Sequence, residues 1–239
     1  DFFHFGLYIC PDLDTVMYNL ADLSNEVTGW GRKDESWQTY SELKVLNQHA
    51  WFQLGDKDIA NHLERNRLLA EGLTLTDATS ELSKKHGLSV NLFPMSDQKV
   101  STIIKTEELG DLPFQEYFVK HKFDPTFLDF HLSGIEAAKI NSVLIKRILE
   151  AEIVIIYPSN PWLSIFPILA VEDMKKLLST KICVAVSPIV GHDAIKGPAA
   201  KIFTERGITP SAKAIAELYG EFIDGIVIDI KNIEEYDEI

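Results

Sequence analysis

The chain has 239 residues, 46% of them hydrophobic, which is enough for one large folded domain with a sizeable core and unlike a disordered chain. Its formal net charge is −13, from 23 basic and 36 acidic residues, and no Lys/Arg run is longer than a pair, which argues against nucleic acid or an anionic membrane as a partner. No apolar run reaches the roughly 18–20 residues of a membrane span, and no basic-then-apolar signal segment is present.

The two cysteines, Cys10 and Cys183, each lie in an apolar stretch. Such a pair is typical of buried free thiols in a reducing compartment rather than of a disulfide framework, so we expect a cytoplasmic protein. The chain begins at Asp1 without an initiating methionine, and we expect it to be part of a longer protein whose missing residues hold part of the functional site.

Two carboxylates, Asp12 and Asp14, lie between an apolar run and a segment with helical spacing, which predicts a strand-to-helix junction. Asp12 has the type and position of a helix cap, and Asp14 would lie in the first turn, where the helix dipole favours it by about 0.3–1 kcal/mol. A second carboxylate at the end of a strand also suits a hard cation or a substrate hydroxyl. Both interpretations remain open here.

Residues 16 to about 88 have mainly helical spacing. The last helix would be capped by Thr76 or Asp77 and would end at Gly87, where glycine allows a left-handed turn. We expect helices over residues 34–48, 56–71 and 76–85.

Asp58, His62 and Arg65 would share one face of the helix over 56–71. These side chains could hold a substrate, or they could form an exposed ladder of ion pairs worth a few tenths of a kcal/mol.

Residues 89–132 change to short β-like runs, and a hairpin through residues 107–111 would join the middle two. The turn at residues 93–97 carries Asp97, which either serves a site or forms a plain Asx turn. The expected strands cover residues 90–93, 100–104, 114–119 and 127–132.

The last hundred residues contain near-continuous apolar runs, typical of parallel strands buried on both faces, separated by helical segments. We therefore predict an α/β fold: a Rossmann-like, doubly wound, mostly parallel sheet with a helical plus antiparallel β-meander insert. The core would comprise residues 1–16 and 133–239, and the insert residues 17–132. The expected core strands are 153–157, 182–186 and 225–229, and the helices are 171–178, 192–206 and 211–222.

Two of these strands lead into turns rich in proline, small hydroxyls and amides, at residues 158–165 and 187–192, and residues 196–201 add a cation. Ligands bind at the carboxyl ends of strands in such sheets, so the turns suit a nucleotide, although tight turns with helix caps would look the same. The absence of HExxH, paired CxxC, GxSxG, a Walker loop and a glycine-rich dinucleotide fingerprint disfavours the corresponding chemistries.

Taken together, the segments resemble the 2-phospho-L-lactate transferases of coenzyme F-420 biosynthesis. The resemblance implies a Mg²⁺-dependent phospho-acid transferase of the EC 2.7.8 class. It would move a 2-phospholactyl or phosphoenolpyruvyl group from a guanosine diphosphate-linked donor to the ribityl hydroxyl of the deazaflavin Fo, releasing GMP. The matching motifs are PDLDT at 11–15, GWG at 29–31 with ESW at 35–37, WFQLGDKD at 51–58, FPMSD at 93–97, FQE at 114–116, PSNP at 158–161 with SI at 164–165, and SPIVG at 187–191 with KGPA at 196–199.

The resemblance also implies roles for individual residues. Asp1 and Asp14 would hold Mg²⁺, and Asp14 and Asp12 would be catalytic, one of them deprotonating the attacking hydroxyl. The nucleotide would contact Pro158, Ser159, Asn160, Ser164, Ser187, Pro188, Gly191, Lys196 and Gly197. The deazaflavin and acid group would contact Asp14, Gln53, Gly55, Asp56, Asp58, His62, Met95, Ser96 and Asp97.

Departures from the family pattern keep other functions open. The glycine-rich opening and one metal ligand are absent from this sequence, and Tyr157 and Phe166 stand where glycines are usual. The alternatives are a non-catalytic nucleotide-sugar-binding regulator of the same fold and an inactive paralogue. A homodimer is the family expectation, and the sequence does not distinguish the lactyl from the enolpyruvyl donor.

Overall fold

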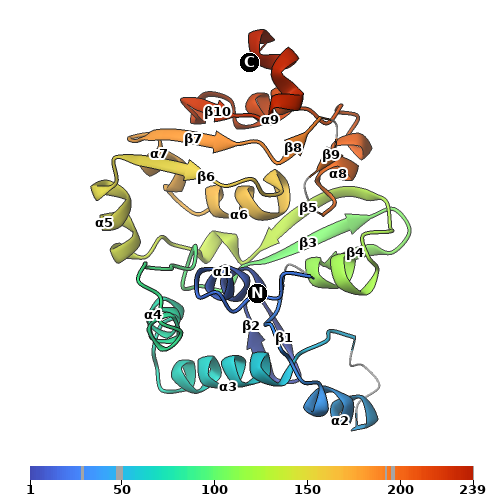
Figure 1. Ribbon diagram of the computed structural model, residues 1–239, viewed down its shortest axis with the longest axis vertical. Helices are drawn as coiled ribbons and strands as arrows, with labels where there is room; N and C mark the ends of the chain where they lie inside the picture. Colours follow the sequence, from blue (N-terminus) through green and yellow to red (C-terminus); the bar gives the residue numbers. More distant parts are fainter. Residues whose placement is uncertain (28–29, 47–50, 192, 195–196, 239) are drawn as a thin grey trace. The chain divides into compact units, whose positions relative to one another are not determined.

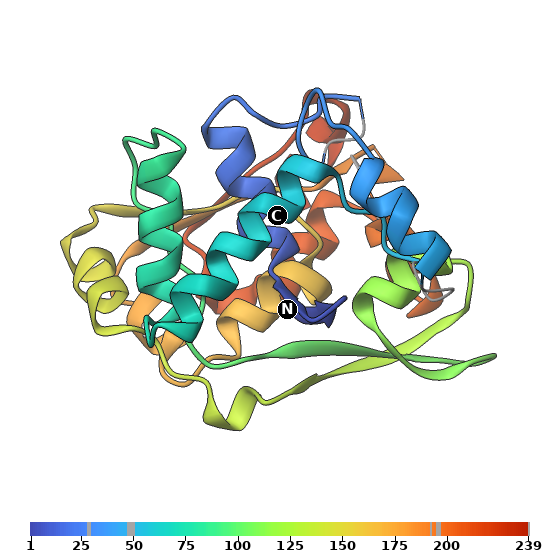
Figure 2. The same cartoon turned by 90° about the horizontal axis from the view of Figure 1, so that it is seen from below.

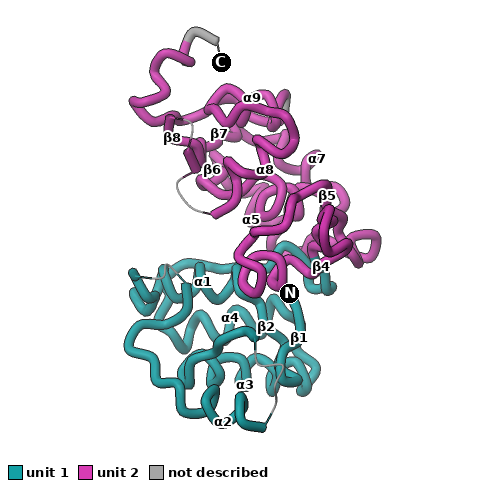
Figure 3. The backbone as a smooth tube through the Cα atoms, turned by 90° about the vertical axis from the view of Figure 1, so that its right-hand side faces the viewer, with its two compact units in different colours: residues 1–101 teal, residues 102–239 magenta. Residues whose placement is uncertain are grey.

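The computed structural model describes residues 1–27, 30–46, 51–191, 193–194 and 197–238 (Figure 1). Contacts divide the chain into two compact units, residues 1–101 and 102–239 (Figure 3), and each is described by itself. Residues 1–16 thus group with the helices of the first unit, a different boundary from the expected one. The functional division into a nucleotide-binding core and an acceptor-binding insert stays a prediction.

The first unit opens with a hairpin of β1 (Phe2–His4) and β2 (Leu7–Ile9), followed at once by α1 (Pro11–Leu20). The expected strand-to-helix junction is therefore present. The expected cap is wrong: Cys10 is the N-cap residue, and Pro11 opens the helix, where its missing N–H costs nothing. Asp12 and Asp14 both fall in the first turn, where the helix dipole favours them.

Three further helices follow: α2 (Gln38–Leu46), α3 (Asp56–Ala70) and α4 (Leu75–Lys85). Thr74 caps α4 by accepting a hydrogen bond from the Asp77 N–H, so the expected cap at Thr76 or Asp77 is wrong by two or three residues. The end of α4 is as expected, with Gly87 at φ +77°.

The core of the first unit forms where α1, α3 and α4 meet (Figure 2). A neighbouring cluster joins β2 to the start of α4. Residues 90–93 form no strand, contrary to expectation, because Leu92 packs with the helical cluster instead of pairing in a sheet. The helical cluster contains Met17, Leu68, Ala78 and Leu82, and its neighbour contains Tyr8, Cys10 and Leu75.

An antiparallel sheet in the order β4-β3-β5 comprises β3 (Ser101–Thr106), β4 (Gly110–Pro113) and β5 (Phe127–Ser133). The β3–β4 hairpin confirms the expected turn, with Thr106 opposite Gly110. The expected strand over 114–119 is wrong. Residues Glu116–Lys120 form a π-helical turn, which buries Tyr117 in the core of the second unit.

The parallel sheet has the order β10-β7-β6, from β6 (Ile153–Ile156), β7 (Ile182–Val186) and β10 (Gly225–Val227), and confirms the mixed α/β fold class. Helices α8 (Ala199–Glu205) and α9 (Ala212–Tyr219) supply buried residues to its core. The remaining elements are η2 (Ile135–Ala137), α5 (Ser142–Glu150), η3 (Pro161–Ile165), α6 (Phe166–Leu169), α7 (Met174–Leu178), β8 (Ile189–Val190), β9 (Asp193–Ala194), η4 (Gly220–Phe222) and η5 (Ile230–Glu238).

The strands of this sheet are not buried on both faces, which corrects the expectation. Along β6, Ile155 is 52% exposed whereas its neighbour Ile156 is 7% exposed. Successive side chains of a strand point to opposite faces, so Ile156 joins the core while Ile155 lies on the other face. No helix in the described part of the chain is long and apolar enough to cross a membrane.

Candidate functional site

The first unit contains a buried ion pair between α1 and α3. Arg65 donates from Nη1 to Asp14 Oδ2 at 3.0 Å, and its Nη2 pairs with Asp14 Oδ1. Asn61 Nδ2 donates to Asp14 Oδ1 at 3.0 Å. All three side chains are buried, so the two helices are joined by a charge pair whose hydrogen bonds replace water.

His62 connects this pair to Asp58. Its Nδ1 lies 3.2 Å from Arg65 Nη1, and its Nε2 lies 3.5 Å from Asp58 Oδ1. Tyr18 donates from its hydroxyl to Asp58 Oδ1 at 2.7 Å. His62 Nδ1 also lies 3.6 Å from Asp14 Oδ2, so the imidazole lies between the carboxylates of Asp14 and Asp58. The exposed-ladder interpretation of Asp58, His62 and Arg65 is therefore wrong, since His62 and Arg65 are buried.

Charge and burial act in opposite directions on these groups. Burial raises the pKa of Asp58, but the nearby His62 ring, the hydrogen bond from Tyr18 and the charge of Arg65 bring it below the usual value, so this carboxylate is ionised at neutral pH. Burial, with Asp14 and Asp58 nearby, raises the pKa of the Tyr18 hydroxyl. Tyr18 is thus a hydrogen-bond donor at all physiological pH values.

The expected Mg²⁺ site does not fit this arrangement. Both oxygens of Asp14 accept hydrogen bonds from Arg65, and Asp1 Oδ2 accepts one from the Tyr8 hydroxyl at 2.8 Å. Among the described residues, no three His, Cys, Asp or Glu side chains are placed to hold a metal ion. Metal binding by Asp1 and Asp14 stays a prediction, and Asp14 could serve it only if Arg65 moved away.

A cavity of about 130 Å³ lies in the first unit beside this network. It brings together three of the expected site residues, Gln53, Gly55 and Asp58. Sequence reasoning assigned no site role to the other lining residues, although GWG and ESW at 29–31 and 35–37 contributed to the resemblance. These other residues are Asn25, Trp30, Gly31, Arg32, Glu35 and Trp37.

Other expected site residues of the first unit serve helix ends. Asp56 accepts hydrogen bonds from the Ser36 hydroxyl and the N–H groups of Gln38 and Thr39, which lower its pKa to about 2. Asp97 accepts one from the Thr76 N–H in the first turn of α4, at 2.7 Å. Ser96 bonds within its own turn, to Gln98, and Met95, Ser96 and Asp97 lie outside the lining of the cavity. Asp12 is exposed in the first turn of α1.

The turn after β6 is organised by Asn160, whose Oδ1 accepts from the N–H groups of Trp162 at 3.0 Å and Leu163 at 3.1 Å. This caps the π-helical turn η3. Pro158, Ser159 and Ser164 lie in or beside the same turn and are exposed or half-buried. The helix-cap interpretation is confirmed for Asn160, and contact with a nucleotide stays a prediction.

The turn after β7 is held by side chains at both ends. Ser187 Oγ bonds to the backbone of Ile189, and Pro188 is buried beside it. Asn232 accepts from the Gly191 N–H at 2.8 Å and donates to the Gly191 carbonyl at 3.0 Å. Sequence reasoning missed Asn232, because it acts on backbone 41 residues away. Gly197 is exposed with φ +71°, and Lys196 lies outside the described residues.

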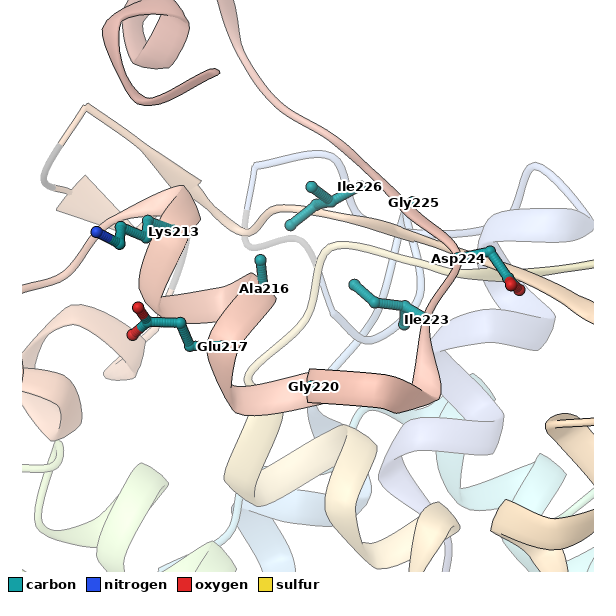
Figure 4. Close-up of a pocket in the computed structure, with 8 residues that line it drawn as sticks. All are labelled: Lys213, Ala216, Glu217, Gly220, Ile223, Asp224, Gly225 and Ile226. Atoms are coloured by element: carbon teal, nitrogen blue, oxygen red, sulfur yellow. The ribbon is translucent and has the colours of Figure 1, made fainter. Parts of the chain in front are cut away.

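A second cavity of about 260 Å³ lies in the second unit between α9 and β10 (Figure 4). Gly225, the first residue of β10, is part of its lining, which contains no expected site residue. The expected nucleotide turns follow the carboxyl ends of β6 and β7, and parallel strands place their first residues at the opposite edge. The position of this cavity therefore does not match the ligand-binding edge of such sheets.

Fold and site define a mixed α/β protein with parallel strands followed by capped, proline-rich turns and with an acid-rich helical part. A family model described as 2-phospho-L-lactate transferase CofD matches residues 3–238. The chain belongs to this family.

Relatives support the assignment over most of the chain. A 2-phospho-L-lactate transferase from Methanococcoides burtonii is 40% identical over 224 residues, which cover 94% of this chain and 73% of the relative. A phosphoenolpyruvate transferase from Thermobifida fusca is 39% identical over 230 residues, covering 94% of this chain and 71% of the relative. A similar fold occurs in a crystal structure of a UPF0052 family member from Bacillus halodurans, with a TM-score of 0.54 and 16% identity. That match covers 89% of this chain and 63% of the other.

Proposed function

We propose that this protein transfers a 2-phospholactyl or phosphoenolpyruvyl group from a guanosine diphosphate-linked donor to the ribityl hydroxyl of the deazaflavin Fo. The observation that carries the proposal is the family match over residues 3–238. Relatives named for each of the two groups are about equally similar to this chain, at 40% and 39% identity, so both donors belong in the test.

The proposed reaction displaces GMP in one step. The ribityl oxygen bonds to the phosphorus of the phospho-acid, the bond from that phosphorus to the GMP oxygen breaks, and the hydroxyl proton passes to a base or to water. Such transfers depend on in-line placement of the two oxygens rather than on covalent work by the protein. The residues of this chain therefore serve mainly to hold donor and acceptor.

Asp58 is the best-supported acceptor ligand. It is ionised, lines the cavity of the first unit and is held by Tyr18 and His62, so its carboxylate can accept hydrogen bonds from ligand hydroxyls. The cavity volume of about 130 Å³ is below the roughly 300–1,000 Å³ of sites for whole drug-sized ligands, so it would take only part of the deazaflavin. Asp14 is paired with Arg65 and so joins α1 to α3, the helix that carries Asp58.

A donor site at the turns after β6 and β7 is part of the proposal. Its support is that both turns lie at the carboxyl ends of neighbouring parallel strands. A requirement for Mg²⁺ remains from the resemblance alone. Chelation should abolish turnover, and returned Mg²⁺ should restore it; turnover that survives chelation would remove the requirement.

The deciding experiment incubates the purified chain with Fo, Mg²⁺ and each donor in turn, and measures GMP by chromatography. We expect GMP release that depends on Fo, at least tenfold slower in Asp58→Asn and unchanged in Glu42→Gln, an exposed acid of α2. A folded chain that binds guanosine diphosphate but releases no GMP would instead support the regulator or the inactive paralogue. Light scattering would test the expected homodimer, with a mass of twice 27.0 kDa.

A further inference from the structure

Two helices of the first unit cap each other's first turns. Glu35, just before α2, accepts hydrogen bonds from the N–H groups of Lys57 and Asp58, each at 2.9 Å. Asp56, the first residue of α3, accepts bonds from the first turn of α2 and from the Ser36 hydroxyl. The N–H groups of a first helical turn lack partners within the helix, so each carboxylate satisfies those of the other helix.

We call this connection the cap exchange. It comprises Glu35, Ser36, Gly55, Asp56 and the backbone N–H groups that they bind, and it includes a backbone contact and a glycine. The Asp56 N–H donates to the Ser36 carbonyl at 2.9 Å. A Cβ at Gly55 would overlap the carboxyl end of Glu35. The Glu35 side chain thus occupies the space that a larger residue at position 55 would need.

The cap exchange joins two walls of the cavity in this unit. Glu35 and Trp37 line it from the segment before α2, while Gln53, Gly55 and Asp58 line it from the start of α3. Glu35 binds the backbone of Asp58, and Tyr18 and His62 hold the carboxylate of the same residue. Loss of Glu35 would release the backbone of Asp58 while leaving its carboxylate contacts in place.

We propose that Glu35 is a positioning residue for the acceptor: it fixes the first turn of α3 so that Asp58 and the wall at Gln53–Gly55 match the bound acceptor. The inference rests on the proposed function for the identity of the acceptor. Glu35 acts on the binding of Fo and leaves the binding of the donor and the transfer step unaffected.

The test compares Glu35→Gln, Glu35→Ala, Gly55→Ala and the double variant Glu35→Ala/Gly55→Ala, with Glu42→Gln as the matched control. A glutamine can accept only one of the two N–H groups, and loss of a hydrogen bond to a charged group corresponds to about a tenfold change. We expect the KM for Fo to rise about tenfold in Glu35→Gln, with kcat and the KM for the donor within about twofold of the original. Glu42→Gln should match the unsubstituted chain.

The double variant distinguishes an effect that acts through the contact between positions 35 and 55 from an unrelated disturbance of the structure. Because a methyl group added at Gly55 would collide with Glu35 itself, Glu35→Ala/Gly55→Ala should bind Fo no more weakly than Glu35→Ala alone. If the losses of Fo affinity in Glu35→Ala and Gly55→Ala add up in the double variant, the positioning role of Glu35 is overturned. Amide hydrogen exchange gives a readout without ligand: the N–H groups of Lys57 and Asp58 should both lose protection in Glu35→Ala, while those of the α4 interior should not.

The outcomes separate this inference from the proposed function. If the unsubstituted chain turns over Fo and Glu35→Gln has an unchanged KM for Fo, or loses kcat instead, the inference is overturned and the function stands. If the unsubstituted chain neither binds nor turns over Fo, the proposed function fails and the acceptor role of Glu35 fails with it.

Discussion

Arg65 is the largest fully buried side chain in the described part of the chain, and it forms an ion pair with Asp14. Burying two charges costs several kcal/mol each, which the pair recovers only while both partners are present. Removal of one partner therefore leaves an uncompensated buried charge. This makes Asp14 important for folding whether or not it also contacts a ligand.

We expect Asp14→Asn to lower the free energy of unfolding by about 3–5 kcal/mol, the usual cost of breaking a buried pair. Urea unfolding followed by circular dichroism measures this. The exposed pair of Arg67 and Glu71 offers the control, and Glu71→Gln should cost less than about 1 kcal/mol. Equal costs for Asp14→Asn and Glu71→Gln would contradict the structural role of Asp14.

The sequence predicted which residues share the face of α3, but not what they face. Asp14 stood out as a spare carboxylate because its partner, Arg65, is 51 residues away. Glu35 and Asn232 were missed for the same reason, since each binds distant backbone groups that carry no residue-type signal. The only signal for Glu35 was its presence in a family motif.

At the scale of elements, α2 and α3 depend on carboxylates outside their own chain segments. Hydrogen bonds from Ser36 and Thr39 hold the pKa of Asp56 at about 2, below its usual 3.8. A carboxylate with a depressed pKa contributes stability above its unfolded pKa, and this contribution is lost as pH falls through the folded pKa. The relevant window for Asp56 is therefore between about pH 4 and pH 2.

Asp56→Asn should lower Tm at pH 7 by about 2–4 °C, and the difference from the unsubstituted chain should shrink as pH falls from 4 to 2. Thermal melts followed by circular dichroism across that range measure both effects. Glu42→Gln should show no such pH-dependent difference. A constant gap at all pH values would mean that the charge of Asp56 is not what stabilises the helix ends.

Hydrophobic runs were a good guide to strand position and a poor guide to burial. The runs at 153–157 and 182–186 are parallel strands as predicted, but side-chain exposure alternates along them. The aromatic run at 114–119 misled in another way, because Phe114, Phe118 and Phe123 stack around a π-helical turn instead of lining a strand. Apolar content alone does not distinguish these environments.

Neighbouring positions on β6 test this difference. Ile156→Ala should lower the free energy of unfolding by about 2–5 kcal/mol, because its side chain is 7% exposed and packs in the core. Ile155→Ala, at a side chain that is 52% exposed, should cost less than about 1 kcal/mol. Urea unfolding measures the free energy of unfolding of both variants. Similar losses in the two variants would mean that both faces of the sheet are covered.

At the scale of the whole molecule, each compact unit has its own apolar core. The clusters around Met17 and Tyr8 consist of residues from the first unit, and the large cluster around Ile104 and Phe203 consists of residues from the second. The sequence predicted a helical part and an α/β part, and contacts group the hairpin β1–β2 with the helical part. A strand of three residues followed by a helix looks the same in either setting.

Separate cores and separate expected sites make the units testable apart. All the expected nucleotide contacts lie between residues 158 and 197, within the second unit. We therefore expect residues 102–239, expressed alone, to unfold cooperatively. Their affinity for guanosine diphosphate should be within about tenfold of that of the whole chain. Calorimetric titration measures the affinity, and residues 1–101 serve as the control without nucleotide binding. A folded 102–239 fragment with no affinity, beside a whole chain that binds, would show that the donor site needs residues of the first unit.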